Sequence, residues 1–554
     1  PANKINEISN IVLRIVNIDV STMLTLNAIS PLEASGAPVF NNNPYLRLNG
    51  RGVLVGIIDT GIDYLNKEFQ REDDTTRIVR IWDQTIQGDK DIYDLKYGTE
   101  YTEDQINQAI SLQTSGGDPY SIVPSKDDIG HGTRLAGIIG GRGINPDLKG
   151  AAPDCQFVIV KLSRATKVEL DAAVIDKTDV PSYSPWSALL ALRYIIAVAR
   201  ELKRPVVVFE PLGSNMGSHT GNGIVEQSIN NYSAQSGTVV VVPTGNQGNT
   251  DTHTEGIIES SGYIKDIEIR VGEKQKNLPI EIWVNKPNRV KLSIVSPSGE
   301  VIDNLEAKNT NNERIKFLYE GTEMIVNFTS PELSTGDSLI FIRAYNLKAG
   351  IWKFRLTGQS IVDGKYYAWI PQRELLDSET KFLNSVGYTT LTLSSTSSGA
   401  ISVAYYNQDD NSVISESGRG YTRYGMIKPD IAAGGFNAIV TNPGGGTAVI
   451  SGSSVAGAVV AGCCALILQW AVVDKNYPDI YAAQIKSYII SGAKGRPGDV
   501  YPNKEWGYGM FDMQGVFDRI RETYSPRSDE DYEEYRVNNL FIRIPKSRYN
   551  RTIN

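Results

Sequence analysis

Three stretches of the sequence carry side chains that could together hydrolyse a bond. Asp59 directly follows an apolar run in VLVGIIDTGID, His131 lies between glycines in GHGTRLAGI, and Ser454 precedes a long run of small residues in VISGSSVAGAVV. A serine hydroxyl is a weak nucleophile near neutral pH. It needs an adjacent base, and that base needs a carboxylate that fixes its tautomer. Asp59, His131 and Ser454, in this chain order, are therefore candidates for a catalytic triad.

The acid and the nucleophile each have a structural alternative. A carboxylate at the end of a buried strand must be hydrogen-bonded or paired. Asp59 could meet this requirement simply by capping the turn that follows its strand. Ser454 could be an ordinary helix N-cap, because serine is frequent at that position. On chemistry alone, Ser451 and Ser453 compete with Ser454. A hydroxyl at a helix N-terminus gains from the helix dipole and nearby N–H groups, and this favours Ser454 as the nucleophile.

The base has few competitors because the chain contains only three histidines. A lone histidine in a turn is more often structural than catalytic. His219 and His253 lie in polar, turn-like stretches. His131 is followed by small residues that predict a tightly packed helix, whose N-terminus could present an imidazole to a cleft. His131 is therefore the favoured base.

Strands and helices alternate around these residues. Helical spacing of apolar residues over 184–204 predicts one of the helices. Apolar runs rich in valine and isoleucine are typical of strands buried on both faces of a parallel sheet. We therefore expect an α/β layered domain. The runs that predict its strands are 53–58, 156–162, 205–209 and 238–243.

The pattern changes to consecutive strands after about residue 256. Six short stretches with turn residues between them predict an all-β sandwich or jelly roll inserted into the α/β domain. They are 267–272, 280–285, 289–297, 323–328, 338–346 and 350–358. The expected organisation is an N-terminal stub (1–30), a catalytic domain in two parts (31–256 and 396–525), the β insertion (257–395) and a C-terminal extension (526–554).

Composition excludes several classes of function. The net charge of −8 does not suit nucleic acid or an anionic membrane, so we expect neither as a partner. Three cysteines in no metal-binding pattern predict buried free thiols in a reducing compartment. The apolar run 456–473 approaches the length of a membrane span, but its many Ala and Gly residues favour a buried core helix. The polar start of the chain indicates no secretory signal.

The three blocks together resemble a known family. GIIDTGID, GHGTRLAG and SGSSVAG are similar to the signature blocks of the subtilisin-like serine peptidases, in the same Asp, His, Ser order. The resemblance implies that fold, with a mainly parallel central sheet, and peptide hydrolysis through an acyl-enzyme. VVVVPTGNQGN resembles the block that supplies the oxyanion-hole asparagine, here Asn246, beside the backbone N–H of Ser454. FEPLGSNMGSHTG resembles the edge strand that binds substrate, here with Leu212, Gly213 and Ser214.

Within the family, the chain resembles the clostridial spore-germination proteases (the Csp group). RIVRIWDQT, the β insertion and EWGYGMFDMQGVFDRI carry this likeness. It implies a cytoplasmic or spore-associated protease with a prodomain, a jelly roll and a role in activating a cortex-lytic proenzyme. The expected partners are a protein or peptide substrate and the chain's own prodomain. NIVLRIVNI (10–18) could be the last strand of that prodomain. We see no convincing calcium loop and expect no metal and no cofactor.

Several positions depart from the family pattern. Arg134 stands where the family has a second histidine, and as a cation near His131 it should lower the pKa of that imidazole. The other departures are Pro211, Ala433, Ser453 and Ala458. Together they support an alternative: a weakly active or non-catalytic regulator or sensor that binds protein or ligand. A binding module centred on the β insertion is a third hypothesis, but it leaves the triad unexplained.

Overall fold

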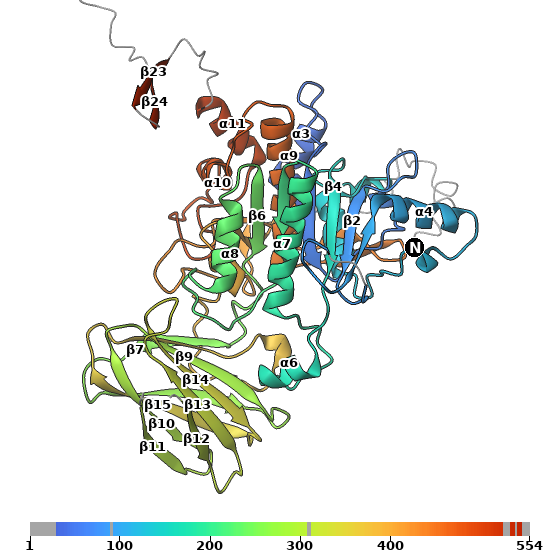
Figure 1. The fold of residues 1–554 in the computed structure, drawn as a ribbon. Helices are drawn as coiled ribbons and strands as arrows, with labels where there is room; N and C mark the ends of the chain where they lie inside the picture. The colour runs from blue at the N-terminus through green and yellow to red at the C-terminus, as the bar shows by residue number, and fades with distance from the viewer. Residues whose placement is uncertain (1–28, 89–91, 307–311, 524–531, 538–539, 546–554) are drawn as a thin grey trace, which may run out of the picture.

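The computed structural model describes residues 29–88, 92–306, 312–523, 532–537 and 540–545 (Figure 1). The prodomain strand expected at 10–18 and nearly all of the N-terminal stub lie outside these residues. In the C-terminal extension, β23 (Tyr532–Val537) and β24 (Leu540–Pro545) pair antiparallel.

A nine-stranded sheet forms the centre of the catalytic domain. The strand order is β19-β18-β6-β5-β1-β4-β2-β3, and β20 also pairs with β18. All neighbours are parallel except β2 with β3 and β18 with β19. The prediction of a mainly parallel α/β fold is confirmed. The strands are β1 (Leu54–Asp59), β2 (Ile78–Asp83), β3 (Thr99–Thr102), β4 (Gln156–Lys161), β5 (Val206–Phe209), β6 (Thr238–Pro243), β18 (Ile401–Asn407), β19 (Ser412–Val413) and β20 (Ile431–Gly434).

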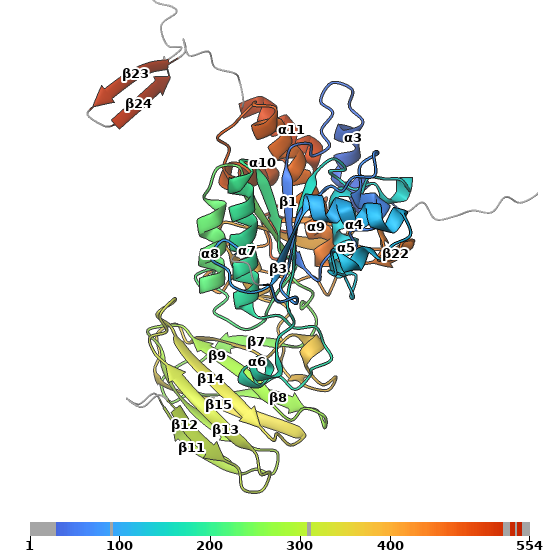
Figure 2. The same ribbon diagram turned by 45° about the vertical axis from the view of Figure 1, so that its right-hand side comes forward.

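Helices cover both faces of this sheet (Figures 1 and 2). α5 and α9 share a hydrophobic core with one face, and α7 packs into a second core on the other. The layers explain why the central strands are apolar on both sides. The helices are α2 (Pro31–Ser35), α3 (Ala37–Asn41), α4 (Glu103–Thr114), α5 (His131–Gly140), α6 (Lys167–Ala172), α7 (Pro185–Glu201), α8 (Ile224–Ser233), α9 (Ser453–Leu468), α10 (Ala482–Ser491) and α11 (Met513–Thr523).

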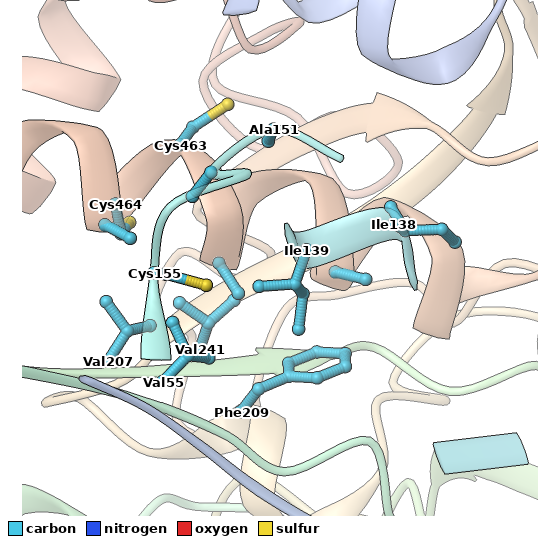
Figure 3. Close-up of a cluster of buried hydrophobic side chains, with 14 of the residues drawn as sticks. Val55, Ile138, Ile139, Ala151, Cys155, Val207, Phe209, Val241, Cys463 and Cys464 are labelled. Carbon is cyan, nitrogen blue, oxygen red and sulfur yellow. The ribbon is translucent and has the colours of Figure 1, made fainter. Parts of the chain in front are cut away.

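The central helix α9 is buried almost completely. With its π-helical continuation it forms an apolar segment, Ser453–Val473, that is long enough to cross a membrane, but 89% of its most apolar window is buried inside the protein. That is the environment of a core helix, as expected. Cys155, Cys463 and Cys464 lie in this core as free thiols (Figure 3). Burial raises the pKa of Cys155 and of Cys463 to about 12, so both remain protonated.

The inserted region consists of two antiparallel sheets packed around one hydrophobic core. The sheet orders are β11-β10-β15-β8-β17 and β12-β13-β14-β9-β16-β7. Along β13–β15 buried residues alternate with residues that are mostly only partly exposed, which fits sheets with one face in the core. The strands are β7 (His253–Ile257), β8 (Ile264–Val271), β9 (Leu278–Val284), β10 (Arg289–Val295), β11 (Val301–Leu305), β12 (Asn312–Lys316), β13 (Glu323–Thr329), β14 (Ser338–Tyr345), β15 (Gly350–Ser360), β16 (Lys365–Trp369) and β17 (Lys381–Phe382).

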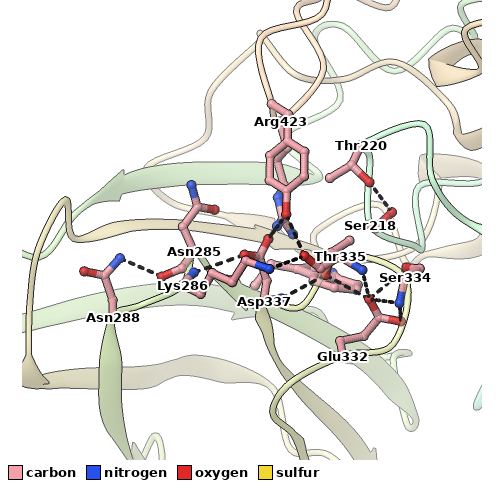
Figure 4. Close-up of polar contacts among 12 residues, drawn as sticks. Ser218, Thr220, Asn285, Lys286, Asn288, Glu332, Ser334, Thr335, Asp337 and Arg423 are labelled. Carbon is pink, nitrogen blue, oxygen red and sulfur yellow. Dashed lines mark hydrogen bonds and ion pairs between the residues drawn. The ribbon is translucent and has the colours of Figure 1, made fainter.

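A buried ion pair joins the β region to the catalytic domain. Arg423 of the catalytic domain pairs with Asp337, which precedes β14, and both side chains are almost fully buried (Figure 4). The Tyr424 hydroxyl also donates to Asp337, at 2.9 Å. The Arg423 guanidinium lies over the ring of Trp283, 4.8 Å from its centroid. Buried charges in proteins are generally paired, and this pair links the two parts through groups withdrawn from water.

Candidate active site

The structure brings the predicted acid and base into direct contact. Asp59 is the last residue of β1, and His131 is the first residue of α5. Nδ1 of His131 lies 2.9 and 2.8 Å from the two carboxylate oxygens of Asp59. The carboxylate is buried, whereas the imidazole is 38% exposed. A carboxylate at Nδ1 selects the tautomer that protonates this nitrogen and leaves Nε2 free to accept a proton.

Two glycines allow this close approach of α5 to β1. Gly130 precedes the helix with φ of +85°, a conformation that glycine adopts without a steric cost. A Cβ on Gly132 would lie 2.2 Å from the carbonyl oxygen of Gly61 and 3.2 Å from Cβ of Asp59. Gly132 therefore brings the start of α5 against the backbone beside Asp59, whereas Gly137 and Gly140 allow close contact with Thr441 and Cys155.

Asp127 holds the start of α5 in place. Its buried carboxylate accepts hydrogen bonds from the N–H groups of Gly130 and Thr133, at 2.7 and 2.9 Å. It also accepts from the Thr60 hydroxyl, at 2.7 Å, so it joins the residue after Asp59 to the helix that carries His131. The sequence analysis missed this residue. An acidic side chain three residues before a glycine-led helix start was the available signal.

Electrostatics at His131 favour the protonated ring. Burial opposes protonation, but attraction to Asp59 and the hydrogen bond with it outweigh burial and raise the pKa of His131 above its ordinary value. Arg134 acts in the expected direction and lowers this pKa, but its effect is smaller than that of Asp59. Arg134 therefore lowers the pKa of His131 as predicted, but this pKa stays above its ordinary value because the effect of Asp59 is larger.

Arg134 is turned toward a neighbouring hairpin. Nε and Nη2 of its guanidinium donate to Oδ1 of Asn442, at 3.0 and 2.8 Å. Asn442 lies in the turn between β21 (Ala438–Thr441) and β22 (Thr447–Ile450). In this chain the residue therefore ties α5 to the hairpin.

Ser454 lies at the start of α9, which packs against α5 and β1. It is partly exposed in the first turn of the helix. Ser453 is buried, with its hydroxyl enclosed and without a partner. The Ser451 hydroxyl accepts from the N–H of Asn437, at 2.8 Å, just before the helix. Within the described part of the chain, no hydrogen bond joins Ser454 to His131, and such bonds are often long in a site without substrate.

Asn246 lies beside the start of α9. Its Oδ1 accepts a hydrogen bond from the N–H of Ser453, at 3.0 Å, and its NH₂ group remains a possible donor. The N-cap residue of α9, Gly452, has no side chain that could cap the remaining N–H groups. The early N–H groups of a helix have no intrahelical partners, so that of Ser454 is open to a ligand oxygen. The Asn246 NH₂ group and the Ser454 N–H are thus two donors near the start of α9.

The predicted substrate edge continues from β5. Leu212, Gly213 and Ser214 follow this strand, and Gly213 is exposed. β5 pairs with β1 only as far as Phe209, so residues 211–214 lie beyond this pairing. The side-chain amide of Gln372, between β16 and β17, donates to the Gly213 carbonyl at 2.7 Å. Pro211 lies in the same segment and offers no N–H there, as expected.

The other two histidines lie elsewhere, at the contact between the two domains. Trp369 is stacked between His219 and His253, with ring centroids 4.1 and 4.4 Å apart. Both histidines are buried, and burial lowers the pKa of His219 to about 3. Of the three histidines, only His131 contacts the carboxylate of Asp59. Among the described residues, no group of three or more His, Cys, Asp or Glu side chains is placed to hold a metal ion.

Comparison with known protein families identifies the family of this chain. The model of the subtilase family (Peptidase S8) matches residues 50–264 and 381–509, which is more than half of the chain. The chain belongs to the subtilase family. Membership places it in the serine protease class of hydrolases. The two matched segments include Asp59, His131 and Ser454, and they leave most of the β region between them.

Solved and curated proteins resemble this subtilase to different extents. The CspB protease of Clostridium perfringens has a TM-score of 0.78 and 29% identity, over 89% of this chain and 97% of that one. The PII-type proteinase of Lacticaseibacillus paracasei is 23% identical over 79% of this chain, and the PI-type proteinase of Lactococcus lactis subsp. cremoris is 25% identical over 42%. The matches span only 23% and 11% of those two proteinases.

Proposed function

We propose that this subtilase is a serine endopeptidase whose triad is Asp59, His131 and Ser454. The contact of the Asp59 carboxylate with Nδ1 of His131 is the observation that carries the proposal. A buried carboxylate at Nδ1 makes Nε2 a proton acceptor, which is what a general base for a serine hydroxyl requires.

The proposed mechanism follows from these positions. Oγ of Ser454 attacks a peptide carbonyl while Nε2 of His131 takes the hydroxyl proton. Asp59 stabilises the imidazolium that results, and the proton then passes to the leaving amine. The acyl-enzyme is hydrolysed by water through the same steps. The NH₂ group of Asn246 and the N–H of Ser454 donate to the oxyanion. The substrate backbone lies as an added strand beside residues 211–214.

A serine-directed fluorophosphonate probe tests this proposal. The folded wild-type protein should acquire one adduct per chain, and mass spectrometry of its peptides should place that adduct on Ser454. Heat-denatured protein should remain unlabelled, because activation of the serine depends on the assembled site. An adduct on Ser451 or Ser453 would reject the assigned nucleophile. A folded protein without any adduct would support the alternative of a non-catalytic regulator.

Replacing Asn246 by alanine should lower kcat by about 10²–10³-fold, because one oxyanion donor is worth about 2.7–4 kcal/mol of barrier. The fold should change little, since Asn246 is exposed. Asn249→Ala is a matched control, because Asn249 is an exposed amide that donates to Ser415, at 3.0 Å. Turnover and circular dichroism of both variants check the prediction. Unchanged turnover in Asn246→Ala would remove this residue from the role.

For the physiological role, we propose activation of a spore cortex-lytic proenzyme by cleavage. The likeness to the CspB protease supports this role. We also propose that the β region has a jelly-roll topology and that the protease processes its own prodomain. A reducing location, the cytoplasm or the spore, suits the three buried free thiols. Incubating the proenzyme with the wild-type protein and with Ser454→Ala should give cleavage only with the former.

A further inference from the structure

Backbone groups along β5 alternate between its two neighbouring strands. The carbonyl of Pro205 accepts a hydrogen bond from the N–H of Leu54, at the start of β1, at 2.9 Å. The N–H of Glu210 donates to the carbonyl of Val241 in β6, at 3.2 Å. Odd-numbered residues along β5 therefore bond toward β1, and even-numbered residues bond toward β6. The pairing with β1 ends at Phe209, so the backbone groups of a later odd-numbered residue face a side without a partner strand among the described residues.

The alternation continues through the substrate edge, residues 211–214. The carbonyl of Ser214 accepts a hydrogen bond from the N–H of Leu393, at 2.9 Å. Leu393 lies on the β6 side, because the N–H of the residue before it donates to the carbonyl of Thr244, directly after β6. Ser214 thus still bonds toward β6, and the carbonyl of Gly213 points the other way, to the side that β1 leaves open. No described backbone group bonds to Gly213.

The side chain of Gln372 already occupies this open side. Its Nε2 donates to the Gly213 carbonyl at 2.7 Å, so its amide stands where the N–H of an added substrate strand would bond. Gly213 is exposed and Gln372 is half-buried, so the contact lies at the surface. The Gln372 side chain has no other hydrogen bond among the described residues. A peptide that pairs with the edge at Gly213 therefore has to displace this one amide.

The backbone that carries Gln372 is anchored next to the proposed oxyanion residue. The N–H of Arg373 donates to Oε1 of Gln247, at 3.1 Å. Nε2 of Gln247 donates in turn to the carboxylate oxygens of Glu374, at 3.3 and 3.1 Å. Gln247 is buried and directly follows Asn246. The segment is thus fixed to the catalytic domain, and rotation of the Gln372 side chain alone is enough to free the substrate edge.

The contact is made by the β region and not by the part that the chain shares with its family. Gln372 lies between β16 and β17, outside the segments 50–264 and 381–509 that the subtilase model matches. Gly213, in contrast, lies within the first of these segments. The inserted region of this chain therefore supplies a group that competes for the substrate edge of the catalytic domain.

On the basis of the proposed peptidase function, we propose that Gln372 is an internal competitor of the substrate backbone. Its amide closes the substrate edge at Gly213, and an extended peptide binds only to the fraction of molecules in which the amide has turned away. Such a competition weakens the apparent affinity by that fraction. Substrates too short to reach Gly213 are unaffected. The inserted region thereby raises the KM of extended peptides and favours those whose other contacts outweigh the competition.

The test uses two chromogenic thioesters with the same residue before the cleaved bond, chosen by screening each amino acid there with wild type. In the short thioester only an acetyl group precedes this residue, and in the long one three alanines precede it. Gln372→Ala should raise kcat/KM for the long thioester by about 2–10-fold, mainly through a lower KM, as expected for one hydrogen bond between uncharged groups. The short thioester should be cleaved as by wild type. Gln372→Met keeps the length without a donor and should show the same gain.

Two controls separate the competition from general effects on the protein. Gln359→Ala removes a half-buried amide of β15 that donates to Glu306, at 2.9 Å, and it should leave both thioesters unchanged. The rate at which the fluorophosphonate probe labels Ser454 should be the same in wild type and in all variants. The probe carries no peptide strand, so this rate reports the integrity of the site without the substrate edge.

Three results would overturn the inference and leave the peptidase function standing. A lower kcat/KM for the long thioester in Gln372→Ala would show that the amide supports the edge instead of blocking it. Unchanged cleavage of the long thioester in Gln372→Ala or Gln372→Met would show that no competition by this hydrogen bond exists. An equal gain with both thioesters would place the effect away from Gly213. If wild type cleaves neither thioester and takes up no probe, the proposed function fails, and this inference fails with it.

Discussion

Replacing Ser454 by alanine is expected to lower kcat by about 10⁶-fold, the largest effect we predict. The nucleophile of a serine protease acts as a unit with its base, and loss of the nucleophile alone removes nearly the whole contribution of the triad. The variant should still hydrolyse the peptide about 10³-fold faster than water alone does, because substrate binding and the oxyanion donors at Asn246 and Ser454 remain. Steady-state hydrolysis of a peptide, with the concentration of each folded protein taken from its absorbance, measures the effect.

Two neighbouring serines provide matched controls for this prediction. Ser453→Ala removes a buried hydroxyl without a partner, and Ser451→Ala removes one that is bonded to the Asn437 backbone. Neither hydroxyl is proposed to touch the substrate, so both variants should keep kcat within a few-fold of wild type. A Ser454→Ala protein that turns over as fast as these controls would show that the family fold is present without the triad chemistry.

Replacing Asp59 by asparagine is expected to lower kcat by about 10⁴-fold. The asparagine amide has nearly the same shape, but its NH₂ group can donate to Nδ1 of His131. That interaction favours the tautomer with the proton on Nε2, which cannot accept the serine proton. Because Asp59 is buried against His131, solvent cannot easily restore the lost interaction. Thermal unfolding of the variant is the control for an intact fold.

The pH dependence of the same variant gives a second readout. In wild type the raised pKa of His131 should place the acid limb of kcat/KM above pH 6.5, because the base must be neutral to work. In Asp59→Asn burial still opposes protonation, and the two largest raising interactions, both with Asp59, are lost while the smaller attraction to Asp127 remains, so the limb should move to lower pH. An acid limb at the same pH in wild type and Asp59→Asn would mean that a group other than His131 controls the pH dependence of kcat/KM.

Stability and activity change in opposite directions over this pH range. The folded pKa of His131 lies above its unfolded value, so the ion pair with Asp59 stabilises the fold fully below about pH 6.5. This contribution is lost as the pH rises through the raised folded pKa. The neutral base needed for turnover appears over that same interval.

The sequence alone was enough to single out the residues of the candidate site. Asp59 directly after an apolar run, His131 at a glycine-rich helix start and Ser454 before a small-residue helix could be recognised because each depends on a local pattern. The alternation of apolar runs and helical spacing likewise predicted the layered α/β domain. Burial on both faces of a parallel sheet leaves that signature in the chain itself.

Only the tertiary structure decided how the surrounding residues are used. Asp127 could be recognised from its place before a glycine-led helix start, but its contact with the Thr60 hydroxyl joins positions 67 residues apart and could not be predicted from the local sequence. Likewise, Arg134 was recognisable as a departure from the family, but its hydrogen bonds to Asn442 join positions 308 residues apart. Such partners are set by how separate elements pack against each other. Local sequence patterns record burial and helix or strand period, but they do not record which surfaces meet.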